Sequence, residues 1–408
     1  MTQPAPQSLI STLVIVAALG YFVDVYDLVL FSIVRVPSLM DLGLSGHALL
    51  NQGMLLLNLQ MAGMLIGGIL WGILGDKKGR VSVLFGSIFL YSVANICNAF
   101  VHSIPAYGFW RLVAGLGLAG ELGAGITLVT EALPKDQRGY GTMLIAGIGI
   151  MGAVVACLIA EFFFWRVNYL IGGGLGLLLL VLRLGVYESG LYARLAGQNV
   201  IRGRFFSLFT DGKRFVRYVR CILAGLPIWF VIGILVTFAP EFARTLNVAD
   251  PIVASKAVMF TYIGVVAGDF ISGALSQLLR RRRQVLLTYV FLCAVCMLIY
   301  FHLEEVSGWI FYSVCLLMGQ AIGYWAVLVT SAAEQFGTNL RSTVTTSVPN
   351  FIRGSLVPLT LLFQFFKNRL GILSAGQCVA AFCVIVAALA VLGLEETYGK
   401  DMDFVEIL

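Results

Sequence analysis

Long apolar segments, separated by short polar ones, dominate the pattern of this 408-residue chain. A helix that crosses the hydrocarbon core of a bilayer needs about 20 apolar residues, and segments near that length recur along the whole sequence. They are 9–34, 49–74, 82–101, 105–130, 140–163 and 168–187, followed by 218–240, 256–279, 284–302, 307–333, 343–366 and 373–394. The pattern predicts an all-α integral membrane protein with twelve transmembrane helices.

The apolar segments fall into two groups of six. We predict one six-helix bundle over residues 1–187 and a second over 218–394, with a basic connector at 188–217 and a tail at 395–408. Hydrophobic residues make up 59% of the chain and charged residues only 12%, about half the charged share of soluble proteins. Lipid is therefore expected to cover most of the surface. The start of the chain, MTQPAPQS, holds no Lys or Arg, which favours a retained first helix over a cleaved signal.

The basic residues between the segments predict the orientation. If the N-terminus is cytoplasmic, 19 of the 27 Lys and Arg residues lie at inside ends and 6 at outside ends, while Arg111 and Arg353 lie at membrane depth. Cytoplasmic loops carry the excess of Lys and Arg, so we expect both termini to be cytoplasmic, in a plasma membrane such as the bacterial inner membrane. On this basis the run RRRR at 280–283 is orientation charge and not a nucleic-acid patch.

The two halves also share a short repeat. EALPKDQRG follows the fourth predicted helix and EQFGTNLRS follows the tenth, so Glu131 and Arg138 are matched by Glu334 and Arg341. Internal repeats are typical of secondary transporters that place their substrate site between two halves. We therefore expect these four residues to act in gating.

The predicted turn between helices 2 and 3 reads GGILWGILGDKKGR (67–80). It resembles the loop signature of the major facilitator superfamily at Gly72, Asp76, Lys77, Gly79 and Arg80. Val81 departs from the signature, which has a basic residue there. We expect Gly68, Gly72 and Gly75 to let helix 2 approach a neighbour closely, and Asp76 and Arg80 to form a latch that opens as the halves move.

Three further segments carry the same resemblance along most of the chain. RLVAGLGLAGELG (111–123) resembles the helix-4 pattern of the superfamily, and YESGLYARL (187–195) and EETYGKDMDF (395–404) resemble segments of its sugar and metabolite branch. Drug antiporters of the family carry Gly-Pro in helix 5, but GIGIMGAVVA (147–156) has no Pro. The resemblance implies two pseudo-symmetric six-helix bundles that transport by alternating access.

Asp24 and Asp27 are the unusual feature of the first segment, because ionised groups at this depth cost about 2.5–3.5 kcal/mol each. Asp27 lies six residues from the segment midpoint near Tyr21, which is about 9 Å toward the outside. Arg111 lies six residues outward of the midpoint of helix 4, near Gly117. A carboxylate and a guanidinium at equal depth can neutralise one another.

Such a pair can also move protons. When Arg111 turns to a substrate, a buried Asp without its partner favours the protonated form, so we assign proton coupling to Asp24, Asp27 and Arg111. The Asp-Val-Tyr-Asp sequence resembles the Asp-Gly-x-Asp signature of aromatic-acid:proton symporters, but Val25 replaces Gly and the aromatic substrate is not carried over. The alternative is a fixed salt bridge that only orients helices 1 and 4. Glu121 is a second candidate proton carrier, and the alternative is that it is a structural partner.

In the second half, Asp269 and Arg353 are both predicted near the midplane. Arg353 is the candidate anion ligand, and the alternative is that it pairs with Asp269. Further candidate substrate-binding residues are polar or aromatic positions of helices 1, 2 and 10: Tyr21, Asn58, Gln60, Tyr324 and Trp325. His47, His102 and His302 share no spacing, so we expect no metal site and no cofactor.

These features predict a secondary transporter and not an enzyme, because no nucleotide loop or nucleophile–base arrangement is present. The expected activity is proton-coupled uptake of a small anionic or zwitterionic metabolite by a monomer in the membrane. The alternatives are proton-driven export of a siderophore or drug-like compound, sugar:proton symport, or a membrane sensor that has kept the fold. Substrate, protons and lipids are the expected partners, and nucleic acid is not.

Overall fold

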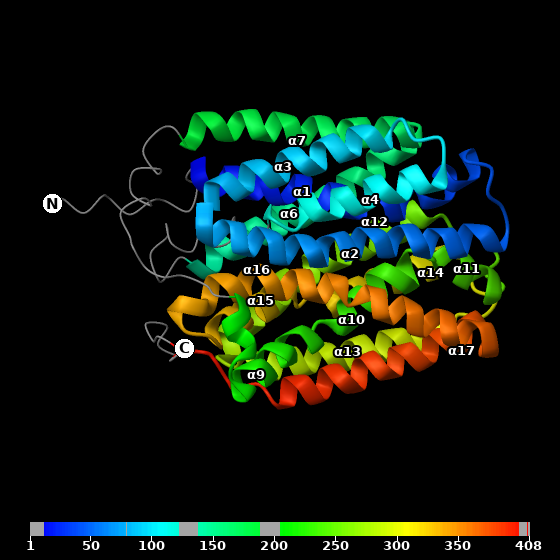
Figure 1. The fold of residues 1–408 in the computed structure, drawn as a ribbon. Coiled ribbons are helices and arrows are strands. Elements are labelled where there is room, and N and C mark those ends of the chain that lie inside the picture. The colour runs from blue at the N-terminus through cyan, green and yellow to red at the C-terminus, as the bar shows by residue number, and fades with distance from the viewer. Residues whose placement is uncertain (1–11, 79, 122–137, 188–204, 400–405, 407–408) are drawn as a thin grey trace.

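The computed structural model describes residues 12–78, 80–121, 138–187, 205–399 and 406, and in these ranges all regular structure is helical (Figure 1). The helices of the first half are α1 (Thr12–Asp41), α2 (His47–Lys78), α3 (Arg80–Asn98), α4 (Ile104–Leu118), α6 (Arg138–Phe162) and α7 (Trp165–Tyr187). Helix α1 packs mainly against α6 and α7, while α4 packs against α2 and α3. These helices form the first bundle.

Close helix contacts in the first bundle depend on small residues. A Cβ atom on Gly63 of α2 would collide with the carbonyl oxygen of Leu112, and one on Gly115 of α4 would collide with that of Gln60. Glycine at both positions lets the α2 and α4 backbones touch, as is common in membrane helix pairs. The sequence predicted close approach at Gly68, Gly72 and Gly75 instead. At Gly68 an added Cβ would lie 3.0 Å from the Cβ of Asn350, so this part of the prediction is confirmed, while the surroundings of Gly75 are not described. At Gly72 that prediction is wrong, because an added Cβ would meet open space.

The helices of the second half form the second bundle. They are η1 (Phe205–Phe209), α9 (Gly212–Leu223), α10 (Leu226–Phe230), η2 (Val231–Val236), α11 (Ala239–Thr245), α12 (Ala254–Leu279), α13 (Arg282–Phe301), α14 (Gly308–Ile322), α15 (Trp325–Glu334), α16 (Thr338–Gly354) and α17 (Leu356–Leu392). Helix α12 packs against α14, and α13 packs against α17 and α14.

Three membrane segments of the second bundle, each predicted as one helix, are interrupted. The 218–240 segment breaks at Ala224 and Gly225, and Pro227 lies in the first turn of α10, where proline is tolerated because its missing N–H would have no helical partner there. The 307–333 segment breaks at Gly323 and Tyr324. The 343–366 segment breaks at Ser355, between α16 and α17. Broken helices free backbone groups near the middle of a bundle, where they can take part in binding.

Helix α17 runs from the second part of the predicted segment 343–366 through most of the predicted segment 373–394. Gly371 adopts φ 83° and ψ 172° inside it, a conformation that residues with a Cβ rarely adopt. The chain therefore turns at Gly371, inside the gap that the sequence predicted between 366 and 373. The part of α17 after Gly371 is the last membrane helix of the chain.

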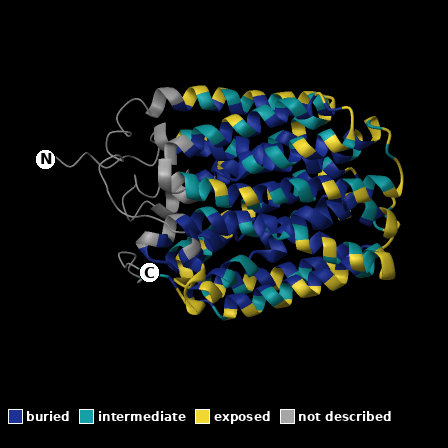
Figure 2. Cartoon of the chain, viewed as in Figure 1, coloured by how far each residue is buried: buried dark blue, intermediate teal, exposed yellow. Residues whose placement is uncertain are grey.

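Length and apolar composition allow nine helical stretches of the described ranges to cross a membrane, with Thr343–Leu392 counted once. Dividing that stretch at Gly371 gives ten, and the shorter apolar helix Val83–Asn98 within α3 gives an eleventh. Helix α4, with 15 described residues, occupies the position of the remaining predicted helix. Figure 2 shows buried residues between the helices and many exposed residues on the outer faces. Large apolar side chains on those faces, such as Phe162 (80% exposed), Leu278 (78%) and Phe291 (71%), are suited to contact with lipid.

Candidate functional site

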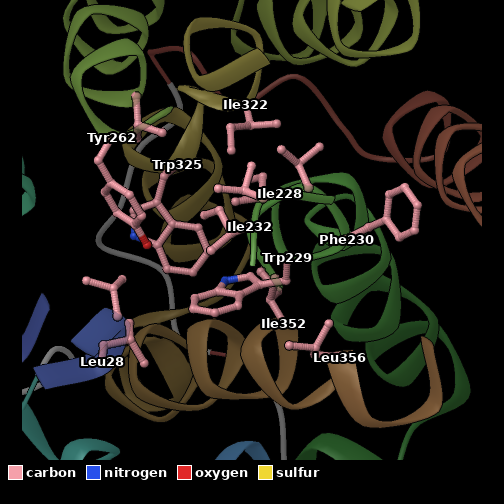
Figure 3. Packing of buried hydrophobic residues seen from close by; sticks show 14 of the residues in the cluster. Leu28, Ile228, Trp229, Phe230, Ile232, Tyr262, Ile322, Trp325, Ile352 and Leu356 are labelled. Carbon is pink, nitrogen blue, oxygen red and sulfur yellow. The ribbon is translucent and has the colours of Figure 1, made fainter. Parts of the chain in front are cut away.

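A cavity of about 40 Å³ lies between the two bundles. Its lining comes from both halves and is almost wholly apolar: Tyr21, Val25, Leu28, Ile150, Ile228, Trp229, Ile232, Tyr262, Val265, Ile322, Trp325 and Arg353. In Figure 3 the rings of Trp229, Trp325 and Tyr262 converge on one space, while Phe230 points away from it. A water molecule needs about 10–15 Å³, so the cavity has the volume of a few water molecules.

Arg353 of α16 is the cationic residue of this cavity. Its side chain is 1% exposed, and Nη2 lies 3.7 Å from Oδ2 of Asp24, which is fully buried. This distance is too long for a hydrogen bond, and neither carboxylate oxygen of Asp24 has a hydrogen-bond partner among the residues that the structure describes. Nε and Nη1 of Arg353 also have none. The Arg353–Asp24 pair is thus buried, and its contact is loose. It differs from the pairs predicted from the sequence, which joined the acids of α1 to Arg111 and, as the alternative, Arg353 to Asp269.

Arg111 of α4 is held inside the first bundle. Its Nη1 donates to Oε1 of Gln60 at 3.2 Å and its Nη2 donates to Oδ1 of Asn95 at 3.0 Å. The guanidinium also lies 4.9 Å from the ring centre of Tyr169. Asp27 is fully buried, and in the described part of the chain its two oxygens have no hydrogen-bond partner. The expected direct pair between Asp27 and Arg111 is therefore not formed in this state.

Glu121 forms a buried ion pair that the sequence argument missed. Nη2 of Arg183 lies 2.6 Å from Oε1 of Glu121, and the two side chains are 3% and 2% exposed. The hydroxyl of Tyr91 donates to Oε2 of Glu121 at 3.3 Å. Arg183 had been counted only as an orientation charge. The available signal was its position within the apolar segment 168–187, where an arginine needs a partner.

The other predicted substrate residues have mixed positions. Tyr21 and Trp325 line the cavity. Asn58 instead accepts a 2.6 Å hydrogen bond from Thr360 of the other bundle. The remaining three hold helices in place through backbone groups: Gln60 donates to the Leu28 carbonyl, Asp269 accepts from the Ala326 amide, and Tyr324 donates to the Ala224 carbonyl. Trp229 and Tyr262, which the sequence argument did not select, line the cavity.

The predicted gating residues are mostly outside the described part of the chain. Gly79 and Glu131 belong to the residues that are not described, as do the side chains of Asp76, Arg80, Arg138 and Arg341. Glu334 is described: it forms an ion pair with Arg282 at 2.6 Å and accepts a hydrogen bond from Thr397 at 2.7 Å. Both partners belong to the second half of the chain, so these contacts do not join the halves.

The end of the molecule that carries the α1–α2 connection, predicted to face outside and called here the outer end, is closed by contacts between the bundles. Arg35 is fully buried and forms a two-pronged pair with Glu241 of α11, in which Nη1–Oε1 and Nη2–Oε2 are both 2.8 Å. Arg35 also donates to the Thr237 carbonyl at 3.2 Å, and the Thr237 hydroxyl donates to Ser32. Sequence reasoning had treated Arg35 only as an outside charge.

Comparison with known proteins decides the family. The family model described as Major Facilitator Superfamily matches residues 17–355. The chain belongs to the major facilitator superfamily. The solved structure of the proton:xylose symporter XylE, another member, has the same fold, with a TM-score of 0.71, 17% identity, and coverage of 96% of this chain and 97% of that one. The twelve-helix fold predicted from the sequence is therefore confirmed.

Relatives in the superfamily are transporters of small metabolites. The niacin transporter of Acinetobacter baylyi is 25% identical over 96% of this chain and 95% of its own. The probable 4-methylmuconolactone transporter of Cupriavidus pinatubonensis is 25% identical, with coverage of 93% and 89%. This chain is accordingly a multi-pass membrane transporter of the superfamily and not an enzyme.

Proposed function

We propose that this transporter takes up a small monocarboxylate with a planar ring, together with a proton, across the bacterial inner membrane. The single observation that carries the proposal is the state of Arg353. It is a buried guanidinium at an apolar, aromatic cavity, with a loose ion pair at 3.7 Å and two nitrogen atoms for which the described residues provide no hydrogen-bond partner. A buried donor without a partner costs about 1–3 kcal/mol, so binding of an acceptor there is favoured.

The donor geometry of Arg353 suits a carboxylate. A guanidinium presents a planar fork of N–H groups, which matches the two oxygens of a carboxylate and adds directional specificity to the charge attraction. Among the described residues, the long contact with Asp24 is the polar interaction that the Arg353 guanidinium makes. A substrate carboxylate can therefore bind Arg353 closely and displace Asp24.

The remainder of the cavity favours a ring over a sugar. Trp229, Trp325 and Tyr262 offer flat faces, and the aliphatic side chains beside them offer no hydrogen bonds. Each buried sugar hydroxyl left without a partner would cost about 1–3 kcal/mol, which argues against sugar symport despite the fold shared with XylE. Niacin, which the relative from Acinetobacter baylyi transports by its name, is a pyridine with one carboxylate and fits this chemistry.

Displacement of Asp24 would couple the substrate to a proton. With Arg353 engaged by the substrate, Asp24 remains fully buried without its counter-charge, and burial of a lone carboxylate favours its protonated form. Binding of one carboxylate would thus bring one proton onto Asp24. Release of the substrate would free Arg353, which would again stabilise the ionised form of Asp24 and expel the proton.

Binding measurements on the purified protein test the substrate class. We expect nicotinate and benzoate to raise the melting temperature more than nicotinamide and benzamide, and D-xylose to have no effect. Arg353→Lys keeps the charge without the fork and should weaken binding of the acids, while Arg353→Ala should abolish it. Equal effects of acid and amide, or acid binding that survives Arg353→Ala, would refute the assignment.

Transport in proteoliposomes tests the coupling. We expect a pH gradient to drive nicotinate accumulation by the parent protein. Asp24→Asn, which cannot exchange a proton, should lose that accumulation and keep nicotinate counterflow, since exchange of substrate for substrate moves no net proton. Accumulation that persists in Asp24→Asn would remove Asp24 from the coupling step.

A further inference from the structure

Three carboxyl groups of the first bundle lie along one face of α1: those of Asp24 and Asp27, and that of Glu121, which lies against Gly20. Gly20, Asp24 and Asp27 are separated by four and three residues, a spacing that places them on the same side of a helix. With a rise of about 1.5 Å per residue, Gly20 lies about 6 Å along the axis from Asp24, and Asp27 lies about 4.5 Å beyond Asp24 in the other direction. Asp27 is on the side of the outer end, and Gly20 is on the side of the predicted cytoplasmic end.

Glu121 is seated on this face at Gly20. A Cβ atom on Gly20 would collide with both Nη2 of Arg183 and Oε1 of Glu121. The absence of a side chain at this position is what lets the Glu121–Arg183 pair lie directly against α1. Glu121 thus provides a third carboxyl group beside this helix, one turn inward of Asp24.

The surroundings of Glu121 come from the first bundle. They are the ion pair with Arg183 of α7 at 2.6 Å, the hydroxyl of Tyr91 of α3 at 3.3 Å, and the backbone of α1 at Gly20. Glu121 itself is 2% exposed. Among the contacts that the structure gives for Glu121, none comes from the second bundle. Because Arg183, Tyr91 and Gly20 all belong to the same bundle as Glu121, these three contacts can persist while the two bundles move relative to each other.

Polar atoms near this pair still need hydrogen-bond partners. Nε and Nη1 of Arg183 and both oxygens of Asp24 are buried and have no hydrogen-bond partner among the described residues. Buried polar groups in this situation are commonly satisfied by internal water. A water bridging two carboxyl groups spans roughly 5–6 Å through two hydrogen bonds of about 2.7–2.8 Å each, close to the rise between Gly20 and Asp24.

We propose that Glu121 is a second proton-carrying residue, which receives the proton of Asp24 and passes it toward the cytoplasm within the first bundle. The proposal rests on the coupling role given to Asp24 above. The neutral acid of Asp24 gives its proton to a bridging water, and that water gives one to the Glu121 carboxylate. Asp24 is then ionised and returns to Arg353, while Glu121 is neutral and its attraction to Arg183 is weakened. Loss of the proton to cytoplasmic water restores the Arg183 pair.

This arrangement separates the two routes through the transporter. The substrate occupies the cavity between the bundles and leaves when they part. The proton passes along α1, between helices of one bundle, and needs no opening of the substrate path. Glu121 is therefore a proton-relay residue that does not touch the substrate, and its removal should affect coupling without affecting binding.

The test compares two transport modes in proteoliposomes with nicotinate as the probe. Glu121→Gln should lower accumulation driven by a pH gradient by about tenfold or more, a loss of the size expected when a proton-transfer group is removed. Counterflow exchange and the thermal shift with nicotinate should stay within about twofold of the parent, as for residues outside the binding site. Glu121→Asp keeps an acid and should recover part of the accumulation. Glu161→Gln, an exposed residue of α6, is the control.

A structural role for Glu121 predicts other results. Glu121→Gln leaves Arg183 buried without its counter-charge, so the double variant Glu121→Gln/Arg183→Gln removes both charges and guards against loss of folding. Recovery of proton-driven accumulation in the double variant, or equal losses of accumulation and counterflow in Glu121→Gln, would overturn the proposal. If Asp24→Asn loses accumulation and Glu121→Gln retains it, only the relay is refuted. If Asp24→Asn retains accumulation, the coupling role of Asp24 itself fails.

Discussion

Glu241→Gln is expected to open the outer end of the transporter. Glu241 contacts Arg35 through two 2.8 Å bonds that join the bundles, and their side chains are 18% and 0% exposed. When the bundles part at this end, Arg35 gains access to water and no longer needs the carboxylate. The substitution therefore penalises the closed state and not the open one.

The expected change in the free energy of the closed–open equilibrium follows from how deeply Arg35 and Glu241 are buried. Removal of one partner from a fully buried pair costs about 3–5 kcal/mol, and exposed pairs are worth about 0–1 kcal/mol. With Arg35 buried and Glu241 partly exposed, we expect roughly 2–3 kcal/mol, since Gln can still accept a hydrogen bond. At about 1.4 kcal/mol per factor of ten, the closed–open equilibrium should shift by about 30- to 140-fold toward the open state.

Labelling of a cysteine at position 54 measures this shift. Met54 is fully buried, and its sulfur accepts a hydrogen bond from Gln364 of the opposite bundle at 3.2 Å. The assay uses Met54→Cys in a background where Cys97 and Cys378, the native cysteines that are not buried, are replaced by Ser. A membrane-impermeant maleimide applied from the outside should label this cysteine much faster after Glu241→Gln.

The matched control is Asp41→Asn. Asp41 pairs with Arg166 at 3.1 Å at the same end of the molecule, but both residues belong to the first bundle. This substitution should leave the labelling rate unchanged. The reasoning is refuted if Glu241→Gln labels at the rate of its parent, or if Asp41→Asn accelerates labelling equally.

Three further outcomes are expected. Gly264→Val should lower the melting temperature, because a Cβ at Gly264 already collides with the Leu316 carbonyl and overpacking costs about 1–3 kcal/mol; a thermal scan without ligand checks this. Glu334→Gln should also lower the melting temperature by removing the Arg282 pair, while labelling of the position-54 cysteine stays at its parental rate; faster labelling would instead support a gating role. Trp229→Ala should weaken nicotinate binding by removing a cavity wall, and unchanged affinity in a titration would exclude stacking there.

Part of the candidate site could be predicted from the sequence. Asp24 and Arg353 stood out because ionisable residues inside apolar segments are costly and usually functional, and the structure brings these two together. Their partnership was not predicted. The depth argument matched Asp27 with Arg111 along the membrane normal, but it contained no information on which direction each side chain faces around its helix.

Other parts of the site depend on packing that has no local signal. Trp229 resembles any aromatic residue of an apolar helix, and it lines the cavity because α10 starts anew after the break at Gly225. Arg35 resembles an ordinary loop charge until α11 brings Glu241 to it. Gly20 gives no sign in the sequence that Glu121 and Arg183 lie against it.

The sequence by itself determined that this chain is a twelve-helix membrane transporter. The free energy of placing each segment in lipid depends on its own composition, so the number of helices and the family signature can be read locally. Only the tertiary structure decided which charges are neighbours, where the cavity lies and which contacts close the outer end. These three features depend on how each helix is rotated about its axis and on where it is broken. Contacts between residues far apart in the chain set both the rotation and the breaks.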